Sequence, residues 1–295
     1  EKADAFHSTV AKGLFVGKRS RLDILPTIAV LCTRVKEPNQ TDWNKLVRLM
    51  KYLNGTREFI LTIRPDNLHI IKWFVDVAFA VHPDFKSHTG MIMSMGKGAM
   101  QSMSKKQKLN TKSSTEGELV GADDASSYIL WTKLFMEAQG YPIEANILMQ
   151  DNKSTILLLE NGKKSSSQRT RHINIRYFFL TDQIEKGNLK VDYCPTDEMQ
   201  GDFMSKPLQG KKFIDFRKQI LNLKDWDRKG QCMFRKLGKT KKETQLKRHQ
   251  LANRSVLEMK ILGPEERTDQ RTKVSRTQGL FDPNPNSCRV PQFHF

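Results

Sequence analysis

Cysteine is scarce in this sequence, and long apolar runs are absent from it. The four cysteines stand far apart and form no C-x-x-C pair. We therefore expect neither a disulfide framework nor a structural zinc site, and the pattern favours a reducing intracellular compartment. No apolar run approaches the roughly 20 residues that a transmembrane helix needs, and we expect no signal peptide. These absences argue against a disulfide-rich secreted domain and against a membrane protein.

Acidic residues are the minority among the charged ones. The chain has 50 Lys and Arg against 32 Asp and Glu, a formal net charge of +18. Such an excess favours a polyanionic partner, most simply a nucleic acid, although an acidic membrane surface also fits. The 295 residues suffice for one large domain or two modest ones. The chain begins at Glu1 and enters a helical pattern almost directly, so we expect a fragment or a processed piece of a longer protein.

Residues 1–64 predict a small helical segment. Their periodicity indicates three helices, and the third is the clearest, with Thr41 able to cap its start and Asn54-Gly55 to end it. The alternating stretch "REFILTI" (57–63) predicts a strand that ends at Arg64-Pro65.

Residues 65–224 alternate between strand and helix patterns. The strands are expected at about 68–79, 89–95, 99–104, 145–150 and 189–194, and the helices at about 114–139, 153–160, 171–186 and 199–205. This order predicts an α/β fold, a mixed five-stranded sheet with flanking helices.

Residues 225–295 differ from the rest. Lys and Arg outnumber Asp and Glu about two to one there, and apolar periodicity is weak. We predict a basic tail, mostly disordered or weakly helical.

Asp76 is the first acid at a telling position, because it lies inside the apolar stretch "IIKWFVDVAFAV". Both faces of this strand look apolar, as in the centre of a sheet. An unpaired buried carboxylate would be strongly penalised, so Asp76 is a candidate functional residue. The alternative is an acid on an edge strand that points to solvent.

Three further acids are candidates. Near the start of the long helix, Ser113 with Glu116 and Thr115 with Glu118 both fit a capping box. We favour Glu118 as functional, because it sits beside the buried stripe, and Glu116 as structural. Asp151 follows a strand, where α/β sheets place their sites, but it equally fits a helix cap. Asp202 stands near a helix start, which needs no functional reason.

Several carboxylates brought together repel one another and raise each other's pKa. A divalent cation reverses that effect, and ligands that are all oxygen suit Mg²⁺ or Mn²⁺. Two such ions roughly 3.5–4 Å apart can activate water and stabilise the leaving oxygen in phosphodiester cleavage. A basic chain with an acidic metal site therefore fits a nuclease.

Several stretches, in this order and spacing, carry a specific resemblance. They are "VDVAFAVHPDFKSHTG", "SKKQKLNTKSSTEGELVGADD", "QDNKSTI", "TRHINIRYFFLTDQI" and "GDFMSKPL". Through them the chain resembles the C-terminal part of the polyprotein of copia-type LTR retrotransposons, where the end of reverse transcriptase meets ribonuclease H. The stretches "AFHSTVAKGLFVG" and "DWNKLVRLMKYLNGT" are similar to the thumb- or connection-like helical end of the polymerase. The resemblance implies a ribonuclease H-like fold for residues 65–224.

The resemblance also implies site residues and a reaction. The family's catalytic, metal-binding acids fall on Asp76, Glu118, Asp151 and Asp202. The implied reaction is hydrolysis of the RNA strand of an RNA–DNA hybrid with two Mg²⁺ ions, or Mn²⁺, one ion activating water and the other stabilising the departing 3′ oxygen. The implied partners are that hybrid and the remainder of the polyprotein, with no membrane, in a cytoplasmic particle or the nucleus.

Two positions depart from the family's pattern, and one motif is missing. Val77 and Gly117 stand where a small residue and Ala are usual, and the glycine weakens the first helical turns by up to about 1 kcal/mol. The Y-x-D-D turn that carries the polymerase aspartates does not occur in the sequence, so we do not expect DNA synthesis from this chain alone.

The stretch "RTRHINIRYFF" (169–179) is a candidate contact for nucleic acid. Its basic side chains are expected largely off the face of the helix that packs, and they are Arg169, Arg171, His172 and Arg176. Such runs are usually solvated faces, but with a hybrid as substrate they would contact phosphates.

Two hypotheses follow from the sequence. The first is an active ribonuclease H, and the second is a decayed remnant that binds nucleic acid without cutting it. An integrase-like nuclease is disfavoured by the order of the acids and the "SKPL" that follows them.

Overall fold

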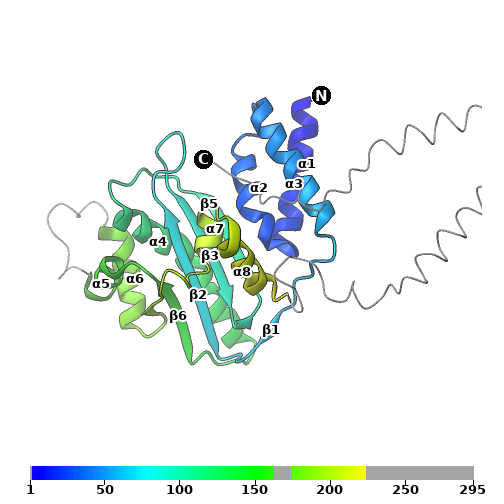
Figure 1. Cartoon of the computed structure of the whole chain (residues 1–295). Coiled ribbons are helices and arrows are strands. Elements are labelled where there is room, and N and C mark those ends of the chain that lie inside the picture. The colour runs from blue at the N-terminus through cyan, green and yellow to red at the C-terminus, as the bar shows by residue number, and fades with distance from the viewer. Residues whose placement is uncertain (1, 163–173, 224–295) are drawn as a thin grey trace, which may run out of the picture. The chain divides into compact units, whose positions relative to one another are not determined.

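The computed structural model describes residues 2–162 and 174–223, and for residues 174–178 it describes the backbone alone. The predicted basic tail, residues 225–295, lies outside the described residues. Figure 1 labels most of the elements along the chain. None of the described helices combines the length and the hydropathy needed to cross a membrane.

The N-terminal part contains the three expected helices, α1 (Lys2–Arg19), α2 (Leu25–Cys32) and α3 (Gln40–Gly55), with a 3₁₀ turn, η1 (Leu22–Ile24), before α2. They enclose a small core of their own, whose buried members are Phe6, Val10, Ile24, Ile28, Leu31, Leu46 and Leu49. The expectation that Thr41 caps α3 is wrong. Asn39 is the cap, because its side chain accepts the backbone N–H of Asp42 while the Asp42 carboxylate accepts that of Asn39.

The strand expected at residues 57–63 is also wrong. Residues 57–63 do not form a strand, and the N–H of Thr62 donates to Leu221 O at 3.1 Å. The two-residue β1 (Arg64–Pro65) follows this segment and lies antiparallel to β4 (Gly96–Lys97). Alternation alone could not reveal that the segment bonds to a helix end and not to a sheet edge.

A buried ionic group, here called the arginine cluster, joins the helical segment to the C-terminal part. Arg21 binds both carboxylate oxygens of Asp23, at 2.9 and 2.8 Å, and Tyr52 donates its hydroxyl to Asp23 at 2.6 Å. Arg217 donates to the Tyr52 hydroxyl at 3.2 Å and lies over the ring of Phe59. The boundary at residue 64 stays a prediction.

The main sheet has five strands, β2 (Ile70–Ala78), β3 (His88–Ser94), β5 (Gln101–Lys106), β6 (Ala145–Gln150) and β7 (Lys190–Tyr193). Their order across the sheet is β5-β3-β2-β6-β7. The pairs β2–β3 and β3–β5 are antiparallel, whereas β2–β6 and β6–β7 are parallel. The mixed five-stranded sheet is confirmed, and β2, which carries Asp76, lies at its centre.

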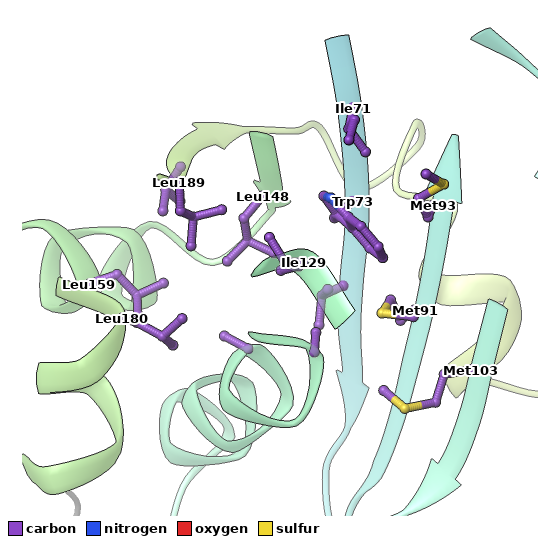
Figure 2. Close-up of a cluster of buried hydrophobic side chains, with 14 of the residues drawn as sticks. Ile71, Trp73, Met91, Met93, Met103, Ile129, Leu148, Leu159, Leu180 and Leu189 are labelled. Carbon is purple, nitrogen blue, oxygen red and sulfur yellow. The ribbon is translucent and has the colours of Figure 1, made fainter. Parts of the chain in front are cut away.

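Helices flank this sheet on both faces. The helices α4 (Ser114–Ala138), α5 (Lys153–Asn161) and α6 (Asn174–Glu185) supply side chains to the main core. Figure 2 shows that core, with Trp73 of β2 between Met91 and Met93 of β3 and Leu148 of β6. Side chains alternate along a strand, so Gly90 and Asp76 face away from this core and toward α7 (Asp202–Ser205).

The last described helix, α8 (Gly210–Leu221), is an addition to the predicted elements. Its buried residues Phe216, Arg217, Ile220 and Leu221 recur at helical spacing. Because α8 carries Lys212 in its first turn and Arg217 further along, it links the arginine cluster to the acids described next.

Candidate active site

Asp76 is held by the segment that forms α7. Its side chain is 1% exposed. The Ser205 hydroxyl donates to one carboxylate oxygen, and the Lys206 ammonium binds the other at 3.0 Å. Burial raises the pKa of Asp76 to about 6, Lys206 opposes that rise, and the nearby Asp202 adds to it. The acid in the middle of the central strand is therefore partnered, but only in part neutralised.

Glu118 and Glu116 take different places at the start of α4. Ser113 caps the helix by accepting the N–H of Glu116, and the Glu116 carboxylate accepts the N–H of Lys112 at 2.6 Å. Glu118, two residues later and 5% exposed, points inward and accepts from Val77 N and Gln150 Nε2, both at 3.3 Å. Glu116 is thus part of the helix cap, whereas Glu118 faces the sheet.

The environment of Glu118 disfavours its charged form. Burial is the largest cause that raises its pKa well above the usual value, and the charges of Asp76 and Asp151 raise it further. The hydrogen bond from Gln150 opposes the rise.

Asp151 follows β6, and the helix cap there is its neighbour. The Asn152 side chain accepts the N–H groups of Ser154 and Thr155, while the Asp151 carboxylate accepts from the Thr196 hydroxyl at 3.1 Å. Asp151 is half-buried. Its carboxylate is consequently free of the capping role that the sequence left open.

Three of the four predicted acids come together. One carboxylate oxygen from each of Asp76, Glu118 and Asp151 lies within 4.8 Å of the others. Asp76 comes from the central strand β2, Glu118 from the start of α4, and Asp151 from the carboxyl end of β6. The three meet where the parallel strands β2 and β6 end. We call this group the acid triad.

Asp202 lies beside the acid triad and is tied to lysines. It is buried at the start of α7, and its two carboxylate oxygens bind Lys206 Nζ at 2.6 Å and Lys212 Nζ at 2.7 Å. Lys206 therefore bridges Asp202 and Asp76. Burial lowers the pKa of Lys206, but the charges of Asp76 and Asp202 and its hydrogen bonds to them outweigh burial and raise it above the usual value.

Four residues that bind these acids were not predicted from the sequence, namely Gln150, Ser205, Lys206 and Lys212. Gln150 is fully buried. Its side-chain oxygen Oε1 accepts the N–H groups of Asp151 and Asn152, and its side-chain nitrogen Nε2 donates to Glu118. One signal was present, since Asp202 and Lys206 stand four residues apart around a helical turn, the spacing of an ion pair.

The backbone of the α7 region packs directly on the strands. A Cβ added to Gly90 would lie 2.5 Å from Ser205 N, and one added to Gly201 would lie 2.9 Å from Asp76 N. Only glycine allows these approaches at both positions. This contact fixes the separation of the segment that carries Asp202 from the strand that carries Asp76.

The two departures from the family's pattern pack toward each other. A Cβ on Gly117 would lie 3.4 Å from a Val77 methyl, and a Cβ on Gly121, one helical turn on, would lie only 2.5 Å from the other methyl. The larger residue on the strand thus fits against a glycine face of α4. Neither departure displaces an acid.

The predicted basic contacts are not placed. Arg169, Arg171 and His172 lie outside the described residues, and Arg176 falls in the first turn of α6, where the backbone alone is described. Their contact with phosphates stays a prediction.

The donors of the acid triad suit a hard divalent cation. All are carboxylate oxygens, which Mg²⁺ and Mn²⁺ prefer. The four acids outnumber the two lysines, which bind Asp76 and Asp202 alone, so the described part of the site keeps an excess of acidic groups. The raised pKa values of Asp76 and Glu118 reflect that excess together with burial. The residues fit a bound cation.

The chain is similar to curated polyproteins of transposable elements. It is 27% identical over 209 residues to a retrovirus-related Pol polyprotein from transposon TNT 1-94 of Nicotiana tabacum, which covers 70% of this chain and 16% of that protein. It is 28% identical over 203 residues, 68% of this chain and 14% of the relative, to that from transposon RE2 of Arabidopsis thaliana. A Ty1 Gag-Pol polyprotein of Saccharomyces cerevisiae is 26% identical over 72% of this chain and 12% of its own length. The chain thus spans less than a fifth of these relatives. No protein-family model matches it.

Solved structures overlap with part of the chain. A ribonuclease H1, LC11-RNase H1 in complex with an RNA/DNA hybrid, covers 44% of this chain with 13% identity and a TM-score of 0.33. The protease–reverse transcriptase of prototype foamy virus covers 53% with 9% identity and a TM-score of 0.29. The ribonuclease H-like class of the fold rests on the order of its own five strands and its flanking helices.

Proposed function

We propose that this chain is the ribonuclease H portion of a copia-type retrotransposon polyprotein and that it hydrolyses the RNA strand of an RNA–DNA hybrid. One observation carries the proposal. Acids from three separate elements, Asp76, Glu118 and Asp151, gather to within 4.8 Å at one edge of a mixed five-stranded sheet. The similarity to Pol polyproteins of transposons supports the same reading.

The acid triad would hold Mg²⁺, with Asp202 beside it as a further ligand. A bound divalent cation supplies activation of water and stabilisation of the charge that develops on the phosphate. The chain's own residues position the ligands. Gln150 orients Glu118 and the turn of Asp151, and Ser205 orients Asp76. The strongly basic chain, at +18, would attract the phosphate backbone.

The neighbouring glutamates provide a matched test. In the full chain with Mg²⁺ and a hybrid whose RNA strand is labelled, we expect Glu118→Gln to lower cleavage to background and Glu116→Gln to retain it. Both changes replace a carboxyl group by an amide in the same helical turn, so the chemical change itself is matched between the two variants. Asp76→Asn should behave like Glu118→Gln, and circular dichroism should show that each variant is folded.

The assay also separates the alternative function. Salt-dependent binding of the hybrid without any Mg²⁺-dependent cleavage by the unaltered chain would favour a binding remnant. Cleavage that persists in Glu118→Gln and Asp76→Asn would contradict the assignment of the site.

A further inference from the structure

The Lys206 ammonium lies between two acids. It is 3.0 Å from Asp76 Oδ1 and 2.6 Å from Asp202 Oδ1. The remaining oxygens of these carboxylates bind Ser205 and Lys212. All four oxygens of the Asp76–Asp202 pair therefore have partners from the chain.

The other side of Asp76 differs. Across the acid triad, Glu118 accepts only two neutral N–H groups, from Val77 and Gln150, and Asp151 accepts the Thr196 hydroxyl. Within the described residues, no lysine or arginine forms an ion pair with Glu118 or Asp151. Asp76 thus belongs to two groups, one bridged by a lysine and one without a fixed cation.

We propose that Lys206 competes with a divalent cation for the Asp76–Asp202 pair, so that the site binds two cations with unequal affinity. This inference rests on the proposed function, which assigns divalent cations to the site. The first cation binds at the acid triad. A second cation that uses Asp76 and Asp202 binds only when the Lys206 ammonium leaves them.

Electrostatics make the two occupants mutually exclusive. An ammonium and a divalent cation bound to the same pair of oxygens would lie within a few ångströms of each other, where like charges repel strongly in a partly buried site. The apparent affinity for the second cation is therefore reduced by the fraction of molecules in which Lys206 holds the pair.

The local structure allows Lys206 to leave. It follows the last residue of α7, its backbone is already extended at φ −120° and ψ 148°, and its side chain is 36% exposed. A lysine is a point charge on a flexible four-carbon stem, so rotation about that stem brings the ammonium into water. Lys212 can stay on the outer oxygen of Asp202. Rearrangement of the sheet or of α8 is not required.

Binding of Mn²⁺ to the full chain without substrate tests this proposal. Free Mn²⁺ is counted by electron paramagnetic resonance during a titration. For the unaltered chain we expect one tighter and one weaker site. In Lys206→Met the weaker site should tighten at least about tenfold, while the tighter site should change less than about threefold.

Two further variants keep the test sharp. Lys190→Met, which removes an exposed lysine paired with Asp192, should leave both sites unchanged. Lys206→Gln should repeat the effect of Lys206→Met if the methionine variant folds poorly. Melting curves give a second readout. Lys206→Met should melt lower than the unaltered chain in EDTA, because two buried carboxylates lose a counter-charge, and Mn²⁺ should raise its melting temperature by more.

The outcomes separate the two claims. Identical Mn²⁺ titrations for Lys206→Met, Lys206→Gln and the unaltered chain would overturn the competition, even if the chain cleaves hybrids. Tightening of the weaker site in a chain that cuts no hybrid would support the competition and count against the proposed nuclease.

Discussion

The arginine cluster and the candidate active site are both buried ionic groups, and the balance of charge in them is opposite. In the arginine cluster, a single carboxylate, Asp23, receives the two parallel hydrogen bonds of Arg21 and the hydroxyl of Tyr52, with Arg217 beyond it. In the candidate active site, two of the four carboxylates, those of Asp76 and Asp202, bind Lys206 and Lys212. Cations are in excess in the first group, and acids are in excess in the second.

The two ionic groups differ in the kind of cation that binds their carboxylates, which is arginine in the first and lysine in the second. A guanidinium fork matches a carboxylate in a fixed geometry, whereas a lysine supplies a mobile point charge. In the arginine cluster, the chain's own groups therefore satisfy both carboxylate oxygens of Asp23. The acid site is incomplete in charge, and burial there raises the pKa of Asp76 and of Glu118.

The largest expected effect is on the arginine cluster. Arg21→Met leaves the buried Asp23 without its guanidinium, and breaking one side of a buried pair lowers the free energy of unfolding by about 3–5 kcal/mol. Urea denaturation followed by circular dichroism measures the loss. For the exposed pair of Lys190 with Asp192, Lys190→Met should lower it by less than about 1 kcal/mol. Equal losses of unfolding free energy in the two variants would contradict the structural role of the arginine cluster.

Gln150→Met should have a smaller effect, directed at the acid site. The change removes the amide that donates to Glu118 and the carbonyl that accepts from Asp151 N. Residues that orient metal ligands commonly contribute a factor of about 10–100 in metal affinity. We expect the tighter Mn²⁺ site to weaken within that range in a titration. A folded variant with unchanged Mn²⁺ affinity would show that Gln150 does not orient the ligands.

The smallest of the three effects is a dependence on pH. The pKa of Asp76 is raised to about 6, so a proton competes with Mn²⁺ as the pH falls through 6. The affinity of the tighter site should be about tenfold lower at pH 5 than at pH 8, as an Mn²⁺ titration at each pH would measure.

The raised pKa of Asp76 also determines how the stability of the metal-free fold changes with pH. Because the folded state holds the Asp76 proton more tightly than the unfolded state does, the contribution of Asp76 to stability is present below the ordinary carboxyl pKa and is lost as the pH rises to about 6. Urea denaturation in EDTA from pH 4 to 7 checks the sign for Asp76, with Asp76→Asn as the reference. A metal-free chain that gains no more stability at pH 4 than its Asp76→Asn variant would contradict the raised pKa.

Periodicity predicted most of the sheet and the helices on it, because those patterns record which face of an element is buried. It also singled out Asp76, since an acid in a central strand breaks the pattern. The strand predicted at residues 57–63 was wrong, because the alternation is a local pattern whereas the hydrogen-bond partner of this segment, Leu221, lies on a helix distant in sequence. Lys206 and Lys212 were not predicted as site residues, because a lysine near a helix end has many ordinary explanations. Val77 and Gly117 looked like separate departures, and only the packing between strand and helix shows that they lie against each other.

The contact of α7 with the sheet bears on the stiffness of the site. Gly90 and Gly201 bring main chain against main chain, and main-chain atoms have no rotamers through which to yield. The distance between the strand that carries Asp76 and the turn that carries Asp202 is therefore fixed by backbone contacts with the sheet. Lys206 differs from this rigid backbone because its side chain is long and flexible. The proposed second cation would therefore need only the Lys206 ammonium to move, while the backbone around the site keeps its position.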